Sequence, residues 1–164
     1  MNQTPTVVDD ETWIRRAIEL AAEARARGDQ PFGSLVVAPD GSVVAEGRNS
    51  LETDDDITGH AETNLVRAAW KRRSEFDLST CTLYTSTEPC AMCAGAIYWA
   101  GIGRVVYGLS EAGLAALTGA DPKNPTMALP SEVVLNSGQH DVEVVGPVLA
   151  DEAAAVHDGF WTFQ

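Results

Sequence analysis

The 164-residue sequence has no long apolar run. Its longest uncharged stretch, Pro89–Gly103, is rich in small residues and is shorter than the roughly 20 residues that a membrane-spanning helix needs. The first 13 residues have neither a basic start nor an apolar centre, which are the marks of a secretory signal. We therefore expect no membrane span, no secretory signal and a cytoplasmic location.

Cysteine is scarce as well. The chain has three cysteines, Cys81, Cys90 and Cys93, which are too few for a disulfide framework and fit a reducing compartment. Two of them form a Cys-x-x-Cys pair, a spacing that is common in metal sites. The cysteines therefore point to metal binding rather than to disulfide bonds.

Positive charge is scarce too, above all in the second half of the chain. The formal net charge is −13, and after Arg104 the sequence has one lysine, Lys123, and no arginine, against eight aspartates and glutamates. Binding to a phosphate backbone depends on clustered lysine and arginine, because displaced counterions supply much of the affinity. We therefore do not expect nucleic acid as a partner.

The remaining composition is that of an ordinary globular protein, with 45% hydrophobic and 21% charged residues. A chain of this length buries about two-thirds of its unfolded surface, so we expect one domain over residues 1–164. Hydrophobic spacing predicts helices over Asp10–Arg27, His60–Arg73, Cys90–Ala100, Ser110–Leu117 and Asp151–His157. β-rich runs and turn residues predict a hairpin over 34–49 and strands over 81–86, 104–109 and 141–149, whereas 118–132 has no assignment.

The order of these elements predicts the fold class. Helices that alternate with strands after an opening hairpin favour an α/β fold, a three-layer α/β/α domain with a mixed five-stranded sheet. We expect the active cleft where the parallel strands end. The helix over Cys90–Ala100 carries no charge on any face, so we expect it to be buried on all sides.

Three residues have the chemistry of a catalytic zinc site. Cys90 and Cys93 lie about one helical turn apart, and His60 supplies a third ligand, which leaves one position of a tetrahedral zinc ion open. Cys81, at the start of a strand, is not expected to fill that position. Glu62 is the candidate base. On a helix, residues two apart point about 200° away from each other, so spacing alone does not place His60 and Glu62 in one pocket.

The segments His60-Ala61-Glu62 and Pro89-Cys90-Ala91-Met92-Cys93 resemble the H-x-E…P-C-x-x-C signature of zinc nucleobase and nucleoside deaminases. The likeness to this cytidine-deaminase-like superfamily continues in order and spacing from Pro31 to Gly113. It implies one Zn²⁺ per subunit, which activates a water for attack on an amidine-like ring carbon. It also implies that Glu62 carries protons to the ring nitrogen and to the departing ammonia, and that the protein is a homodimer.

The resemblance leaves three substrate classes open. tRNA adenosine deaminases are similar over Glu88–Gly108, but the scarcity of basic residues argues against tRNA. Bacterial guanine deaminases are similar at Gly95–Ala100, although the acidic stretch with which they usually hold the base is missing and Asp121 is the remaining substitute. Fungal-type cytosine deaminases have a similar aromatic and acidic C-terminus, here His157–Gln164. We expect a free nucleobase or related amino-heterocycle, with guanine-like purines ahead of cytosine-like or isocytosine-like rings.

Candidate substrate contacts follow from the same resemblance and from side-chain chemistry. Asn49 matches an asparagine that contacts the base, and its amide suits the edge of a heterocycle. Trp99 is expected at the pocket or at a subunit interface, and His140 and His157 are expected at the surface. A zinc-stabilised binding module without activity is the non-enzymatic alternative, and it has no use for Glu62. The full set of candidate contacts is Asn49, Ala61, Phe32, Trp99, Asp158, Phe160 and Trp161.

Overall fold

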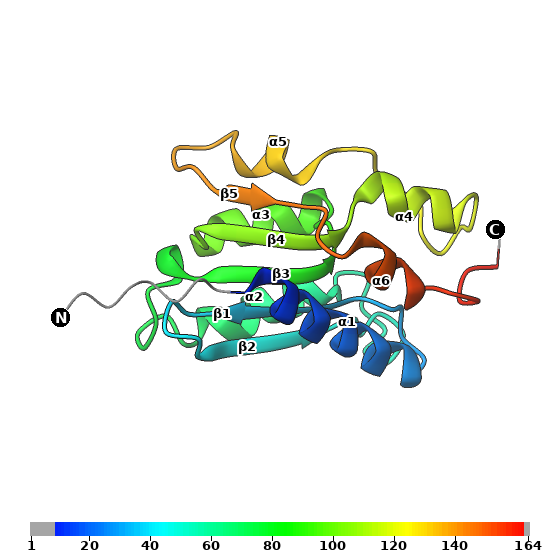
Figure 1. Cartoon of the computed structure of the whole chain (residues 1–164), viewed down its shortest axis with the longest axis horizontal. Coiled ribbons are helices and arrows are strands. Elements are labelled where there is room, and N and C mark those ends of the chain that lie inside the picture. The colour runs from blue at the N-terminus through cyan, green and yellow to red at the C-terminus, as the bar shows by residue number, and fades with distance from the viewer. Residues whose placement is uncertain (1–8, 163–164) are drawn as a thin grey trace.

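The computed structural model describes residues 9–162, whose helices surround one sheet (Figure 1). The helices are α1 (Asp10–Ala26), α2 (Ala61–Trp70), the short 3-10 helix η1 (Leu78–Thr80), α3 (Ala91–Ala100), α4 (Glu111–Thr118), α5 (Ser131–Leu135) and α6 (Ala150–Ala155). The strands are β1 (Gly33–Val37), β2 (Val43–Arg48), β3 (Thr82–Thr87), β4 (Arg104–Leu109) and β5 (Glu143–Val145). Among these described residues, no helix is long and apolar enough to cross a membrane.

The strands form a mixed five-stranded sheet in the order β2-β1-β3-β4-β5. Strand β1 is antiparallel to both β2 and β3, whereas β3, β4 and β5 run parallel. The β1–β2 hairpin turns at Gly41, whose φ of 86° lies in the left-handed region that glycine adopts without strain. The predicted mixed sheet and its opening hairpin are therefore confirmed.

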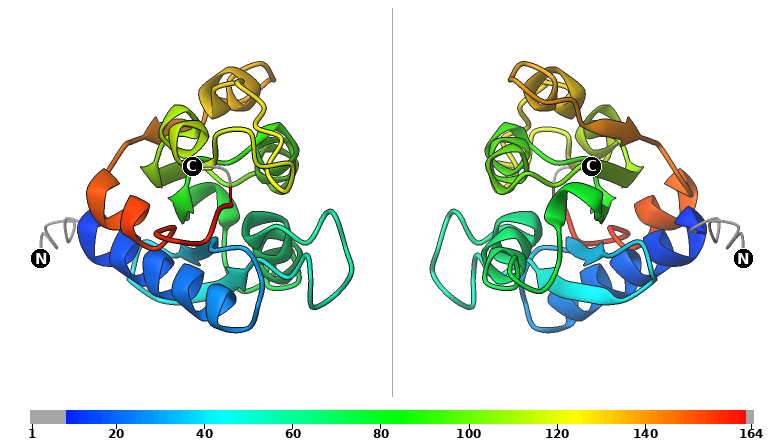
Figure 2. Two further views of the ribbon diagram at one scale, coloured as in Figure 1. Left: turned by 90° about the vertical axis from the view of Figure 1, so that its right-hand side faces the viewer. Right: turned by 90° about the vertical axis from the view of Figure 1, so that its left-hand side faces the viewer.

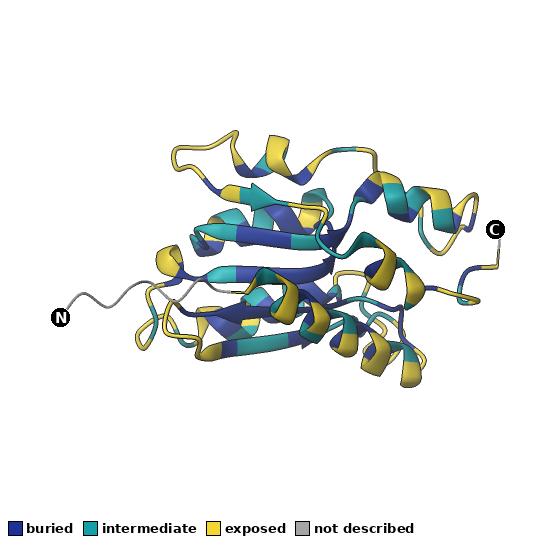
Figure 3. Cartoon of the chain, viewed as in Figure 1, coloured by how far each residue is buried: buried dark blue, intermediate teal, exposed yellow. Residues whose placement is uncertain are grey.

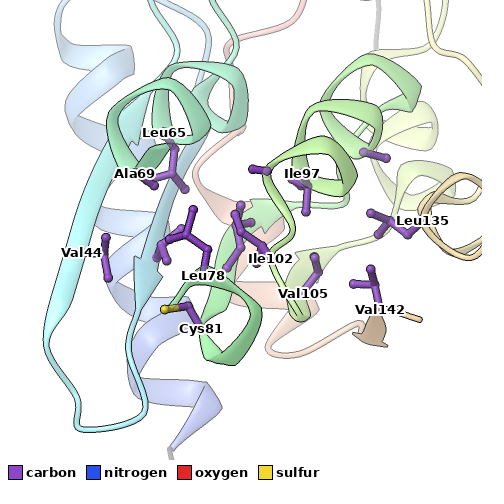
Figure 4. Packing of buried hydrophobic residues seen from close by; sticks show 14 of the residues in the cluster. Val44, Leu65, Ala69, Leu78, Cys81, Ile97, Ile102, Val105, Leu135 and Val142 are labelled. Carbon is purple, nitrogen blue, oxygen red and sulfur yellow. The ribbon is translucent and has the colours of Figure 1, made fainter. Parts of the chain in front are cut away.

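Helices cover both faces of the sheet, as the end-on views show (Figure 2). On one face, α1 buries Ile14 against residues that include Val106 of β4. On the other face, Leu65 of α2 and Ile97 of α3 belong to one core with Val105 of the same strand (Figure 4). Successive residues of a strand point to opposite faces, so Val105 and Val106 belong to two separate cores. The predicted three-layer arrangement is confirmed.

Helix α3 departs from the prediction that it is buried on all sides. One side of α3 packs on the core, but Met92 is 40% exposed and Trp99 is 82% exposed. Figure 3 shows the same division between buried strands and partly exposed helices. The absence of charge on a helix shows only that burial is permitted, whereas the neighbouring elements decide which side they cover.

The end of the chain also differs from the expectation. His157 follows α6 and was expected at the surface, but its side chain is 1% exposed and accepts a hydrogen bond from Trp161 Nε1 across 3.0 Å. His140, in contrast, is exposed and stacks on Tyr98, with ring centroids 4.1 Å apart. The local sequence pattern does not show that His157 is buried, because its burial comes from contacts with distant residues such as Phe32.

The parallel strands β3 and β4 end next to each other and position the site. Glu88, the residue after β3, donates its backbone N–H to the carbonyl of Leu109 at the end of β4 across 2.7 Å. Helix α3 begins just beyond Glu88, and its neighbour α2 begins beside it. The cavity described below lies at this edge of the sheet, where an active cleft is expected because the parallel strands end there.

Candidate metal centre and active site

Three metal-ligating atoms meet where helices α2 and α3 begin. His60 precedes α2 with an extended backbone (φ −75°, ψ 153°), and Cys90 precedes α3 in a similar conformation (φ −68°, ψ 172°). Cys93 is the third residue of α3, so its side chain faces the residue that caps the helix. The potential ligand atoms of His60, Cys90 and Cys93 all lie within 4.8 Å of one another.

The spacing of these atoms fits a zinc ion. His60 Nδ1 lies 3.4 Å from Cys93 Sγ and 3.6 Å from Cys90 Sγ. Zinc–nitrogen bonds of about 2.0–2.1 Å and zinc–sulfur bonds of about 2.3 Å at tetrahedral angles separate nitrogen from sulfur by about 3.6 Å. Among the described residues, no fourth histidine, cysteine or acid joins the group, so one coordination position is left for water or substrate.

Cys81 plays no part in this site, as the sequence predicted. Its side chain is 1% exposed and belongs to the core between the sheet and helices α2 and α3. Its thiol donates a hydrogen bond to the carbonyl of Asp77 across 3.4 Å. Cys81 is therefore a packing residue.

The two site thiols differ in acidity, which prepares them for a cation. Hydrogen bonds from Cys93 and His60 lower the pKa of Cys90 to about 4, against the opposing effect of burial. The pKa of Cys93 is raised, because its thiol donates to Cys90 and is buried. Cys90 therefore offers a thiolate ligand, and binding of a divalent cation would require Cys93 to lose its proton as well.

Glu62 lies beside the metal ligands in the first turn of α2. Its side chain is 5% exposed, and burial is the largest effect that raises the pKa of its carboxyl group. Because His60 precedes the helix in an extended conformation, the helical angle that separates residues two apart does not apply, and both side chains line one cavity. The sequence pattern could not show this, since it does not reveal where the helix begins.

The cavity next to these residues has a volume of about 290 Å³. Ligand pockets typically measure about 300–1,000 Å³, so this one suits a small molecule. It is lined by Gln30, Phe32, Asn49, Leu51, Ile57, His60, Glu62, Thr87, Glu88, Cys90, Ala91, Met92, Glu111, Leu114, Lys123, Asn124, Pro125, Thr126 and Met127.

The structure brings Asn49 and Phe32 of the candidate contacts to this cavity. Asn49 is 1% exposed, and its Oδ1 accepts the backbone N–H of Leu51 across 3.1 Å, which orients the amide. Its Nδ2 donates to no described residue and is available to a ligand. Ala61 is fully buried but is not among the lining residues, because it packs closely against Gly47 of β2. Ala61 is therefore a packing residue within this chain.

Trp99 is not placed at the cavity. Its side chain is 82% exposed on α3 and lies outside the lining set. Trp99 was expected at the pocket or at a subunit interface, and the expectation that it lines the pocket of its own chain is therefore wrong. The reason is geometric, since the cavity is lined by Cys90, Ala91 and Met92 at the start of α3, whereas Trp99 lies near the other end of the helix.

The C-terminal candidates do not line the cavity either. Asp158 is exposed, and Phe160 packs under the Arg25 guanidinium, 5.6 Å from its ring centroid. Trp161 is 4% exposed and lies 6.2 Å from Phe32, measured between ring centroids. The expectation that these three side chains contact the substrate is not met in this chain, where Trp161 supports the cavity wall from behind Phe32.

Asp121, the substitute for a base-holding acid, has a structural role instead. It lies outside the cavity lining, and its Oδ1 accepts the backbone N–H of Lys123 across 2.9 Å. Its Oδ2 accepts the backbone N–H of Thr162 across 2.9 Å. Asp121 therefore ties the C-terminal segment to the loop that covers the cavity.

Several cavity residues were not predicted from the sequence. The unassigned stretch 118–132 supplies Lys123–Met127, and Glu111 enters from the first turn of α4. Glu88 links these parts, because its Oε1 accepts the backbone N–H of Glu111 and its Oε2 accepts both donors of Ser131, each across 2.9 Å. The available signal was position, since Glu88 and Glu111 each follow the end of a parallel strand.

Comparisons with known proteins agree with this geometry. Residues 7–109 match the family described as the cytidine and deoxycytidylate deaminase zinc-binding region. A "Probable cytosine deaminase" from Schizosaccharomyces pombe is 43% identical over 161 residues, 98% of each chain. Guanine deaminase from Bacillus subtilis is 46% identical over 101 residues, 61% of this chain and 64% of the relative.

More distant relatives extend the comparison. A tRNA-specific adenosine deaminase from Bacillus subtilis is 31% identical over 159 residues, 94% of this chain and 90% of the relative. The solved structure of guanine deaminase from Nitrosomonas europaea superimposes with a TM-score of 0.76 at 26% identity, covering 94% of this chain and 86% of that one. These matches and the zinc-binding triad of His60, Cys90 and Cys93 show that the chain belongs to the cytidine and deoxycytidylate deaminase family and is a zinc-dependent deaminase.

Proposed function

We propose that this deaminase acts on a free nucleobase or a related amino-heterocycle, with guanine-like purines first and cytosine-like or isocytosine-like rings next. In the reaction, water replaces the amino group on a ring carbon, so that a carbonyl forms and ammonia leaves. The observation that carries the proposal is the buried side chain of Glu62, which lines the same small cavity as the zinc ligands His60 and Cys90 and as Asn49.

Zinc, Glu62 and Asn49 have separate roles in this reaction. When bound, zinc supplies a Lewis acid that activates water. Glu62 takes one proton from the attacking water and delivers it to the ring nitrogen, and it then moves the second proton of that water from the new hydroxyl group to the departing amine. This role suits a carboxyl group whose pKa is raised by burial. The Asn49 amide holds the edge of the ring and limits its rotation, so that the amino-bearing carbon stays near the metal.

The cavity favours a free base over a polynucleotide. Its described lining contains one lysine, Lys123, and no arginine, together with the three acids Glu62, Glu88 and Glu111. Phosphate groups are attracted by clustered cations, which this lining does not offer. Two of the relatives above are named for free bases, cytosine and guanine.

The similarity to tRNA-specific adenosine deaminases supports a second candidate, adenosine in a tRNA. The net charge of −13 and the acidic cavity oppose it. A zinc-stabilised module without activity is opposed by Glu62, because its buried side chain lies outside the group of metal ligands and such a module has no use for it.

An ammonia-release assay tests the proposal. Zinc-loaded wild type is given guanine, isocytosine, cytosine, adenine, their nucleosides and a tRNA stem-loop. We expect release from free bases and loss of activity by at least about 10³-fold in Glu62→Gln, with zinc retained. The control variant Glu132→Gln, which changes an exposed acid on α5, should match wild type.

Preference for the stem-loop over every free base would reject the proposed substrate class. Full activity of Glu62→Gln would reject the assigned proton carrier. Absence of ammonia from every substrate, with zinc bound, would favour the binding module.

A further inference from the structure

Glu111 is a cavity acid that the mechanism above does not use. It is the first residue of α4, it lines the cavity, and it is 9% exposed. Its backbone N–H donates to Glu88 Oε1 across 2.9 Å, which fixes the start of α4. Its own carboxylate accepts no hydrogen bond and forms no ion pair within residues 9–162.

The other acids of the cavity and the Gln30 amide already have protein partners. Both oxygens of Glu88 accept backbone or hydroxyl donors, and Glu62 Oε1 lies 2.9 Å from the Thr85 hydroxyl. Gln30 Nε2 donates to the carbonyl of Lys123 across 3.0 Å. A carboxylate that is largely withdrawn from solvent gains from a hydrogen-bond donor. The Glu111 carboxylate borders the cavity without a donor from the described residues, so it is available to a donor on a bound ligand.

The contacts of Glu111 place it near the metal ligands. Its backbone N–H donates to Glu88, which lies two residues before Cys90, and Glu111 lines the cavity together with Cys90 and Glu62. Burial is the largest effect that raises the pKa of Glu111, to about 7, and the negative charges of Cys90, Glu88 and Glu62 raise it further. Glu111 is therefore placed to meet the part of a bound ring that lies beside the amino group.

We infer that Glu111 determines substrate specificity by accepting a hydrogen bond from a ring N–H next to the carbon that loses its amine. The substrates are then cyclic guanidines, in which the amino-bearing carbon stands between two ring nitrogens. One nitrogen carries a hydrogen for Glu111, and the other receives the proton from Glu62.

This chemistry separates the candidate bases. Guanine and isocytosine have an N–H on one side of the amino-bearing carbon, whereas cytosine and adenine have a ring carbon at that position and offer Glu111 no N–H donor. The inference rests on the proposed function and sharpens it, because it selects the 2-amino-4-oxo type of ring among free bases.

The test compares kcat/KM of wild type, Glu111→Gln and the exposed control Glu132→Gln for guanine, isocytosine and cytosine. We expect wild type to prefer guanine and isocytosine. Glu111→Gln replaces a charged acceptor by a neutral amide, whose oxygen accepts a weaker hydrogen bond. This change should lower kcat/KM for these two bases by about 10-fold, and for cytosine by less than about 3-fold. An equal loss for all three bases, or a wild-type preference for cytosine, would overturn the inference while leaving the proposed function intact.

A fourth substrate gives a kcat/KM ratio that would not change if Glu111 had only a structural role. 2-Aminopurine has a ring nitrogen without hydrogen beside the amino-bearing carbon, so wild type should use it at least about 10-fold less well than guanine. The amide of Glu111→Gln can donate to that nitrogen, which should narrow the difference. Equal kcat/KM for the two purines in wild type would overturn the inference even if the variant fails to fold. If wild type releases ammonia from none of the bases, the proposed function itself fails.

Discussion

Thr85 Oγ1 lies 2.9 Å from Glu62 Oε1 and also 2.9 Å from the carbonyl oxygen of Thr87. The hydroxyl has one hydrogen, so it donates to Glu62 when that carboxyl is ionised and to Thr87 when Glu62 is protonated and donates in turn. The strand β3 therefore supports both protonation states of the proton carrier on α2.

Replacing Thr85 with valine should impair catalysis without loss of metal. Valine keeps the shape but removes the hydrogen bond, which should lower kcat by about 5- to 30-fold for the best free base. Steady-state kinetics and zinc content measure the two effects. The matched control is Ser34→Ala, which removes a buried hydroxyl of β1 that has no described partner. Unchanged kcat in Thr85→Val would count against its support of Glu62.

The metal site predicts a difference among the cysteines. Cys93→Ser should lose most of the bound zinc and melt at a lower temperature, because ion binding stabilises the start of α3. Cys81→Ser should keep its zinc, since Cys81 lies in the core. Elemental analysis of both purified variants measures the zinc bound per chain. Zinc retained by Cys93→Ser and lost by Cys81→Ser would show that the ligand assignment is wrong.

Glu88 joins the strand end to helices α4 and α5, so its replacement should affect both stability and activity. In Glu88→Gln an amide nitrogen faces a backbone N–H donor at Glu111 or Ser131, which should cost about 1–3 kcal/mol of unfolding free energy. Chemical denaturation measures this loss. The exposed Glu132→Gln should stay within about 0.5 kcal/mol of wild type. Equal unfolding free energies of Glu88→Gln and Glu132→Gln would show that Glu88 does not anchor helices α4 and α5.

His157 makes stability depend on acid pH. Burial lowers the pKa of His157 to about 4, whereas its ordinary value is 6.5. Between these values the unfolded chain binds a proton that the folded chain does not, so stability is complete above pH 6.5 and falls as the pH drops toward 4. At pH 5 this effect should cost wild type about 2 kcal/mol relative to pH 7.5.

Denaturation of wild type, His157→Gln and the exposed control His140→Gln at both pH values measures this contribution. Any loss of zinc at pH 5 affects all three proteins and cancels in the comparison. We expect His140→Gln to follow wild type and His157→Gln to lose less stability between the two pH values. Parallel losses in all three proteins would show that His157 does not titrate as a buried neutral group.

The sequence predicted well those helices and strands whose position depends on neighbouring residues in the chain. The hairpin follows from turn residues around Gly41, and the boundaries of α1 follow from its apolar spacing and from Asp9, whose side chain caps the helix. The cysteine pair was recognisable because both ligands lie in one turn of one helix. The pairing of His60 with Glu62 rested on the family resemblance, since the helix begins between them.

The sequence by itself therefore identified the residues that hold zinc and carry protons, because local spacing and a family signature are enough to recognise them. Only the tertiary structure decided which other side chains reach the cavity. Glu111 and the segment Lys123–Met127 are distant in sequence from the metal ligands and reach the cavity only through the packing of the elements around it. The same holds for Trp99 and His157, since exposure of the first and burial of the second depend on the elements packed around them and not on local pattern.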